Sequence, residues 1–299
     1  MNNVKSTFSI KDLENLTGIK AHTIRIWEKR YNLLQPERTD TNIRYYSLSN
    51  LQKLLNISYL NSNGYKISKI AGLDNDGIRA LVKDVAQNDA TNNHALDAFK
   101  LSMLNFDQKL FYDTYNGLLK EKSFTEMFYE DLIPLLSEIG LLWQTDTITP
   151  AHEHFLTSLI RQKILINTEK IQAENQVTTD KIFVLYLPDN EVHELGLMLI
   201  NYEIIARGHQ SIFLGQSVPL NSLRDILGYY DDITFVSYFT VKPEKDQLED
   251  YIKDFTEEIL IKDSARLWVL GRMLEEIDLN SLPDRIIPFD TIKNLVKKL

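Results

Sequence analysis

The chain has 299 residues, of which 43% are hydrophobic and 25% are charged, so it is long and apolar enough for two or three globular domains. It contains no cysteine, which excludes disulfide frameworks, thiolate metal sites and cysteine nucleophiles and fits a reducing compartment. The N-terminus lacks an apolar segment of signal-peptide length, and no run is apolar enough to span a bilayer. We therefore expect a cytoplasmic protein with no membrane partner.

Charge is distributed unevenly along the chain. Residues 1–70 hold 7 Lys and 4 Arg against 2 Asp and 3 Glu, a net charge of +6. Because the whole chain has a formal net charge of −9, the remaining 229 residues carry −15. A basic segment followed by an acidic one indicates that the N-terminal part contacts a polyanion.

Residues 1–75 are predicted to form a winged helix-turn-helix domain. Apolar side chains recur at helical spacing over 10–16 after the cap residue Ser9, and Thr17-Gly18 separates this helix from a second helix over 20–31. The segment 36–46 predicts two strands joined by a turn, which form the wing. A third helix follows over 48–60, and a short fourth helix lies within 61–73.

Cations line the second helix and the wing, where they are expected to meet phosphates, while the start of the helix reads base edges. The residues that we expect to contact DNA are His22, Thr23, Arg25, Lys29 and Arg30 on the second helix and Arg38, Arg44 and Tyr45 on the wing.

A dozen spaced positions in this segment agree with one known pattern. They are the run 23–31, Leu33-Leu34, Pro36, Arg38, Arg44-Tyr45-Tyr46 and Asn63-Gly64-Tyr65. Over about residues 6–75 the chain thus resembles the winged-helix DNA-binding domain of MerR-type transcription regulators. The resemblance implies a palindromic operator in double-stranded DNA, bound by a dimer or tetramer. Asn42 replaces the usual wing glycine and also tolerates a left-handed backbone. A winged helix used for protein contacts is the alternative.

The middle of the chain is predicted to be helical. Residues 76–93 contain a short helical piece and a polar stretch, and we expect them to form a linker. From residue 95 to about 171, apolar side chains recur at helical spacing, and Thr149-Pro150 places a cap residue before a first-turn proline. The range 94–178 is therefore predicted to be a four-helix bundle.

Residues 179–299 alternate short apolar runs with helical segments. Strands are predicted at 182–187, 211–215, 233–239, 267–271 and 286–289, and helices at about 191–206, 219–229, 243–261 and 291–299. This alternation predicts an α/β domain with a flavodoxin-like (Rossmann-like) five-stranded parallel sheet and helices on both faces. Ligands of such sheets bind beyond the carboxyl ends of the strands.

His193 is the candidate metal ligand at that edge. It follows the first strand, and a neutral imidazole there can coordinate a metal. Glu191, two residues earlier, can accept the proton of the other ring nitrogen, and Gly196 lets a large group approach the start of the helix. By itself, a histidine in this position is more often a surface or capping residue.

The Glu191-x-His193-x-x-Gly196 spacing resembles the cobalamin-binding Asp-x-His-x-x-Gly motif. Trp143, nine intervening residues and Glu153-His154 match the Trp-x9-Glu-His signature of the cobalamin-dependent MerR-type regulators, the CarH, CarA and LitR group. The resemblance implies that His193 ligates the cobalt of adenosylcobalamin or methylcobalamin. It further implies that Trp143, Glu153 and His154 cover the upper face of the corrin and that Ser237 and Gly271 contact the cofactor.

Three positions depart from that pattern. Gln144 replaces the histidine that ligates cobalt after photolysis in light-sensing members, although His152 lies close in sequence. Arg272 replaces a second glycine, and Phe239 occupies more of the channel for the nucleotide tail. We therefore expect an altered tail pocket.

The sequence thus predicts a DNA-binding transcriptional regulator, a repressor rather than an enzyme, controlled by a cobalamin held between the bundle and the α/β domain. Light control is implied by the resemblance alone. The main alternative is a MerR-type regulator whose sensor domain has lost cobalamin and responds to another ligand or a protein partner. A cobalamin-dependent mutase or methyltransferase would need a separate substrate domain. A zinc or iron site is disfavoured because His152 and His154 would lie about 200° apart around a helix.

Overall fold

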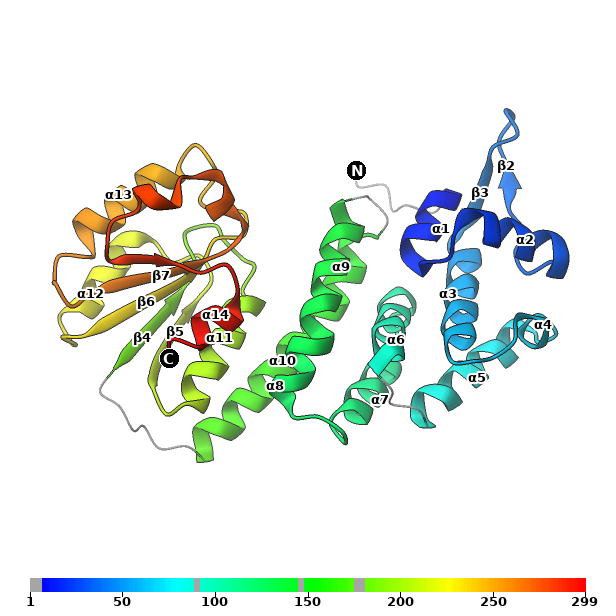
Figure 1. The fold of residues 1–299 in the computed structure, drawn as a ribbon, viewed down its shortest axis with the longest axis horizontal. Coiled ribbons are helices and arrows are strands. Elements are labelled where there is room, and N and C mark those ends of the chain that lie inside the picture. Colours follow the sequence, from blue (N-terminus) through cyan, green and yellow to red (C-terminus); the bar gives the residue numbers. More distant parts are fainter. Residues whose placement is uncertain (1–6, 89–91, 145–147, 175–180) are drawn as a thin grey trace. The chain divides into compact units, whose positions relative to one another are not determined.

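The computed structural model describes residues 7–88, 92–144, 148–174 and 181–299 (Figure 1). The chain divides into two compact units, Met1–Leu159 and Ile160–Leu299. The first unit holds the predicted winged helix together with most of the predicted bundle, and the predicted boundary at 178/179 lies outside the described residues. Among the helices of the described part, none has the length and apolarity that a bilayer crossing requires.

The first unit begins with the predicted winged helix-turn-helix. Its elements are β1 (Thr7–Phe8), α1 (Ile10–Thr17), α2 (Ala21–Tyr31), β2 (Glu37–Arg38), β3 (Arg44–Ser47), α3 (Leu48–Ser62) and α4 (Ile67–Ile70). The three strands pair antiparallel in the order β1-β3-β2, and Arg38 stands opposite Arg44 across the wing.

Local sequence signals explain these boundaries. Ser9 and Asp12 form a reciprocal capping box at the start of α1, with hydrogen bonds of 2.7 and 3.2 Å. Gly18 ends α1 at a φ of 70°, in the left-handed region that glycine adopts at low cost. Asn42 turns the wing at a φ of 65°, as expected for an asparagine in place of glycine. Leu13 and Ile24 are fully buried between the helices.

Most of residues 76–93, which were predicted to form a linker, form a helix instead. Helix α5 (Asn75–Asn88) covers most of this range, and residues 89–91 lie outside the described residues. Ile78, Val82 and Val85 recur at helical spacing and are buried, and α5 packs against α3 and α7. The linker prediction is wrong for residues 76–88, because three apolar residues on one face outweigh the polar composition of the segment.

The predicted bundle is present as four helical segments. They are α6 (Asn92–Asn105), α7 (Gln108–Leu118), a continuous run of α8 (Phe124–Met127), a π-helical turn (Phe128–Leu132) and α9 (Ile133–Gln144), and finally α10 (Pro150–Glu174). Figure 1 shows α6 and α7 side by side in the first unit, and α6 also packs against α3. Helix α10 starts at Pro150, as predicted, and continues into the second unit.

The second unit is the predicted α/β domain. Strands β4 (Ile182–Tyr186), β5 (Gln210–Gly215), β6 (Ile233–Tyr238), β7 (Arg266–Leu270) and β8 (Ile286–Pro288) form one parallel sheet in the order β5-β4-β6-β7-β8. Its helices are α11 (Leu195–Ala206), α12 (Arg224–Leu227), α13 (Leu248–Glu258) and α14 (Ile292–Val296), and Figure 1 shows α11 and α14 on one face and α12 and α13 on the other. This is the flavodoxin-like order: all strands run parallel, β5 lies on one side of β4, and β6, β7 and β8 follow on the other side, so the strand order reverses between β4 and β6.

Candidate functional site

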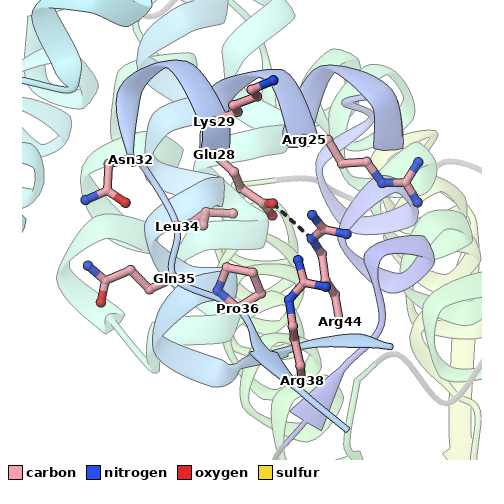
Figure 2. Close-up of a pocket in the computed structure, with 9 residues that line it drawn as sticks. All are labelled: Arg25, Glu28, Lys29, Asn32, Leu34, Gln35, Pro36, Arg38 and Arg44. Atoms are coloured by element: carbon pink, nitrogen blue, oxygen red, sulfur yellow. Dashed lines mark ion pairs between the residues drawn. The ribbon is translucent and has the colours of Figure 1, made fainter. Parts of the chain in front are cut away.

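The first candidate site is a cationic pocket between α2 and the wing (Figure 2). It has a volume of about 510 Å³ and is lined by Arg25, Glu28, Lys29, Asn32, Leu34, Gln35, Pro36, Arg38 and Arg44. Four of the predicted DNA-contacting residues therefore meet around one opening. Exposed guanidinium and ammonium groups in this arrangement suit the phosphates of a nucleic acid backbone.

Glu28 organises the pocket from within. Its side chain is 9% exposed, its Oε2 lies 3.4 Å from Nε of Arg44, and its Oε1 accepts a hydrogen bond of 2.5 Å from the Tyr46 hydroxyl. Figure 2 shows the guanidinium groups of Arg44 and Arg38 near each other on this side of the pocket. The carboxylate therefore fixes the position of Arg44 and offsets the repulsion between neighbouring cations.

Arg38 and the predicted DNA-contacting residues outside the pocket lie on the same domain. Arg38 donates to Oδ1 of Asn42 at 2.6 Å, which ties it to the turn of the wing. The Tyr45 hydroxyl donates to Glu37 at 2.7 Å, and the Arg30 guanidinium lies 5.3 Å from the centre of the Tyr31 ring. His22 is exposed and Thr23 is half-buried at the start of α2.

The second candidate site lies at the carboxyl edge of the parallel sheet, in the loops after β4 and β6. Glu191 is 1% exposed and accepts five hydrogen bonds through its two carboxylate oxygens. Oε1 accepts from the backbone N–H of Val192 and His193 and from Nδ1 of His193, the last at 2.6 Å. Oε2 accepts from the backbone N–H of Val241 and Lys242 at 2.7 and 2.9 Å. Glu191 thus joins the two loops at the point where the strand order reverses.

These hydrogen bonds determine the ionisation of Glu191 and the tautomer of His193. Burial by itself raises the pKa of the Glu191 carboxyl, but the bonds from His193 and the backbone N–H groups outweigh it and lower the pKa to about 2. A carboxylate that accepts the Nδ1 proton leaves the lone pair of the neutral imidazole on Nε2. The His193 side chain is 48% exposed. The arrangement therefore presents an oriented imidazole as a metal ligand.

The remaining predicted cofactor residues of this unit lie around the same edge. A Cβ on Gly196 would lie 2.8 Å from the Tyr238 ring, so this ring is the large group that approaches the start of α11. Ser237 is fully buried and donates to the backbone oxygen of Tyr186 at 2.9 Å. Gly271 has a φ of 117°, and a Cβ there would lie 2.2 Å from the backbone oxygen of Phe239. Gly196, Ser237 and Gly271 therefore have packing functions in this structure.

The predicted upper-face residues belong to the first unit. Trp143 lies in α9, and its side chain is outside the described residues. Glu153 is half-buried and His154 is exposed in the first turns of α10. His152 is buried, with its ring stacked on Phe106 at a centroid distance of 4.9 Å, and burial lowers the pKa of His152.

The sequence did not identify every residue at these two sites. At the cationic pocket, nothing in the sequence around Glu28 indicated that its carboxylate pairs with Arg44. At the edge of the sheet, Arg161 forms an ion pair with Glu194, next to His193, and the sequence distance between the two residues gave no indication of this contact. Within the described residues, no group of three or more His, Asp or Glu side chains is placed to hold a metal ion.

Two family models match the chain. The MerR HTH family regulatory protein model matches residues 8–76, and the B12 binding domain model matches residues 95–166. The chain combines a MerR-type helix-turn-helix domain with a B12-binding domain. The resemblance that the sequence motifs indicated is confirmed, and the B12-binding match falls on the helical segment that holds Trp143, Glu153 and His154.

Similar proteins and a similar structure agree with this assignment. The chain is 29% identical over 243 residues to the HTH-type transcriptional repressor CarH of Myxococcus xanthus, with 79% of each chain covered. It is 24% identical over 223 residues to the repressor CarA of the same organism, covering 73% of this chain and 71% of CarA. The monomethylamine corrinoid protein of Methanosarcina barkeri superposes with a TM-score of 0.57 at 12% identity, covering 70% of this chain and 98% of that chain, which shows a shared fold.

The donor set at the carboxyl edge of the sheet would suit a corrinoid whose cobalt is held by an imidazole nitrogen. His193 is oriented by Glu191 and exposed, and its imidazole would hold the cobalt of such a group. Phe239, which the sequence predicts to narrow the channel for the nucleotide tail, leaves little open space around itself. Phe239 is fully buried and packs edge-on against Tyr251 with ring centroids 5.6 Å apart.

Proposed function

We propose that this protein is a transcriptional repressor whose DNA binding depends on a cobalamin ligated through His193. The winged helix, with its MerR family match and cationic pocket, provides the DNA-binding surface. The observation that carries the cofactor part is the hydrogen bond of 2.6 Å between Nδ1 of His193 and Oε1 of Glu191, because it orients the imidazole as a ligand. Repression follows the names of the similar proteins CarH and CarA.

The finer parts of this proposal rest on the sequence. Trp143, Glu153 and His154 are proposed to contact the corrinoid because their spacing and the B12-binding match coincide. The cofactor is proposed to be adenosylcobalamin or methylcobalamin, and the DNA a palindromic operator bound by a dimer or tetramer in the cytoplasm. In this proposal, cobalamin shifts the equilibrium between two oligomeric states of the protein only to the extent that it binds one state more tightly than the other. Light control is proposed from the family resemblance alone, and Gln144 stands in place of the second histidine.

Absorption spectroscopy tests the cofactor assignment. Purified protein is incubated with adenosylcobalamin in the dark, separated from free cofactor by gel filtration, and compared with His193→Ala treated in the same way. We expect wild type to retain a corrin spectrum of the form in which the cofactor's own base is displaced from cobalt. We expect the variant to lose the spectrum or to show the base bound to cobalt. Colourless wild-type protein with adenosyl-, methyl- and hydroxocobalamin alike would contradict the proposal and favour a sensor domain for another ligand.

A further inference from the structure

Helix α2 exposes one large apolar side chain among its cations. Ile26 is 53% exposed, although the other large apolar residues of α2, Ile24 and Trp27, are buried or half-buried. Successive residues of a helix are about 100° apart, so positions 22, 25, 26 and 29 share one face about 100° wide. Ile26 thus lies on the face that carries His22, Arg25 and Lys29.

The fold does not require an isoleucine at this position. The buried side of α2 is formed by Ile24, which is 0% exposed, and Ile26 points away from it. The surrounding charge indicates which partner covers Ile26. Exposed residues 22, 25 and 29 are a histidine and two cations, and such a face is complementary to DNA.

We infer that Ile26 contacts the C5-methyl group of a thymine in the major groove and gives the protein a preference for a T·A pair at one position of each half-site. The inference rests on the proposed DNA binding. Thymine is the standard base that displays a methyl group in the major groove, and apolar side chains contact that group. The neighbouring Arg25 and Lys29 contact phosphates or guanine edges, which leaves the methyl group to Ile26.

A thymine-to-uracil replacement tests this contact, because it removes the methyl group and leaves the base-pairing edge unchanged. Full-length protein first selects its preferred sequence from double-stranded oligonucleotides with a randomised centre, with and without adenosylcobalamin in the dark. Each thymine of the selected sequence is then replaced by uracil, and dissociation constants are measured for wild type and Ile26→Ala. Alanine is the best helix former, so the variant keeps α2 intact.

Wild type is expected to bind about three- to fivefold more weakly when uracil replaces the contacted thymine in one half-site only, the change that corresponds to burying one methyl group. Ile26→Ala is expected to bind the thymine and uracil duplexes equally and to keep the wild-type salt dependence. Ile261→Ala, which removes an isoleucine that is 66% exposed in the second unit, is expected to retain the wild-type preference.

Two results would overturn the inference. If uracil has no effect at any thymine, or has the same effect in wild type and Ile26→Ala, Ile26 contacts no methyl group while the proposed DNA binding stands. If wild type selects no sequence from the pool in either condition, the proposed function fails and the inference fails with it.

Discussion

Each of the two candidate sites contains a buried carboxylate that holds a functional side chain in place. Glu28 pairs with Arg44 at 3.4 Å and accepts from Tyr46, and Glu191 binds His193 at 2.6 Å. Both carboxylates are at most 9% exposed, so their partners are fixed before any ligand arrives. Such preorganisation reduces the rotamer entropy that binding would otherwise remove.

Replacement of Glu191 by glutamine should change how stability depends on pH. Hydrogen bonds lower the pKa of Glu191 to about 2, below its ordinary value of 4.5, so the ionised group stabilises the fold above about pH 4.5. That stabilisation, on the order of 3 kcal/mol, is lost as the pH falls from 4.5 towards 2. The difference in unfolding free energy between wild type and Glu191→Gln should therefore be largest at pH 7 and shrink towards pH 2.

Denaturant unfolding between pH 2.5 and 7 measures this difference. The second unit is followed through the fluorescence of Trp268 in β7, with Trp27 and Trp143 replaced by phenylalanine in both proteins. Titration of other carboxyl groups is common to both proteins and cancels in the comparison. A difference that stays constant over the whole pH range would contradict the assigned ionisation of Glu191.

At the scale of elements, the loops at the carboxyl edge of the sheet are held by backbone contacts. After β7, Gly271 turns the chain at a φ of 117° into a 3-10 helix (Arg272–Glu276), and Met273 donates its N–H to the oxygen of Phe239 at 3.1 Å. Any side chain at position 271 would collide with the backbone of the loop after β6. Gly271 is therefore required by the fold, whatever it contributes to a ligand.

Gly271→Ala should destabilise the second unit by on the order of 2–4 kcal/mol, because the new Cβ would lie 2.2 Å from a backbone oxygen in a conformation that favours glycine. Gly228→Ala is the matched control. Its Cβ would meet Asp225 at an ordinary 3.7 Å with a φ of −74°, so we expect a change within about 0.5 kcal/mol. Thermal or denaturant unfolding compares the two variants, and equal losses of stability would disprove the proposed collision.

Elements with a strong period or cap were predictable from the sequence. The strand–helix alternation after residue 181 gave every strand of the sheet, and Ser9, Gly18 and Thr149-Pro150 marked helix ends close to where they occur. A short helical piece was expected within residues 76–93, but the length and packing of helix α5 were missed because its polar composition concealed the spacing of Ile78, Val82 and Val85.

The candidate sites were predictable where a side chain carries the chemistry. His193 and the cations of α2 and the wing were identified by residue type and spacing. The N–H groups of Val241 and Lys242, which donate to Glu191, belong to the backbone of a loop distant in sequence. Because every residue except proline has a backbone N–H group, the sequence cannot show which of these groups bind Glu191. The contact of Tyr238 with Gly196 likewise depends on strand order, which residue spacing does not specify.

At the scale of the whole molecule, a basic DNA-binding segment is joined to an acidic remainder. Residues 1–70 carry +6 and the rest −15, so the attraction to DNA is concentrated in the winged helix. Control by a cofactor then requires that cofactor binding and DNA binding change each other's affinity. Thermodynamic linkage makes the two effects equal, since each measures the same coupling free energy.

The most direct test is the dissociation constant for the selected DNA with and without adenosylcobalamin in the dark, at one salt concentration, for wild type and His193→Ala. We expect the cofactor to change the wild-type dissociation constant by at least about fivefold and to leave that of His193→Ala unchanged. We also expect DNA to change the affinity of wild type for adenosylcobalamin by the same factor. Equal dissociation constants for wild type with and without the cofactor would contradict control of DNA binding by cobalamin.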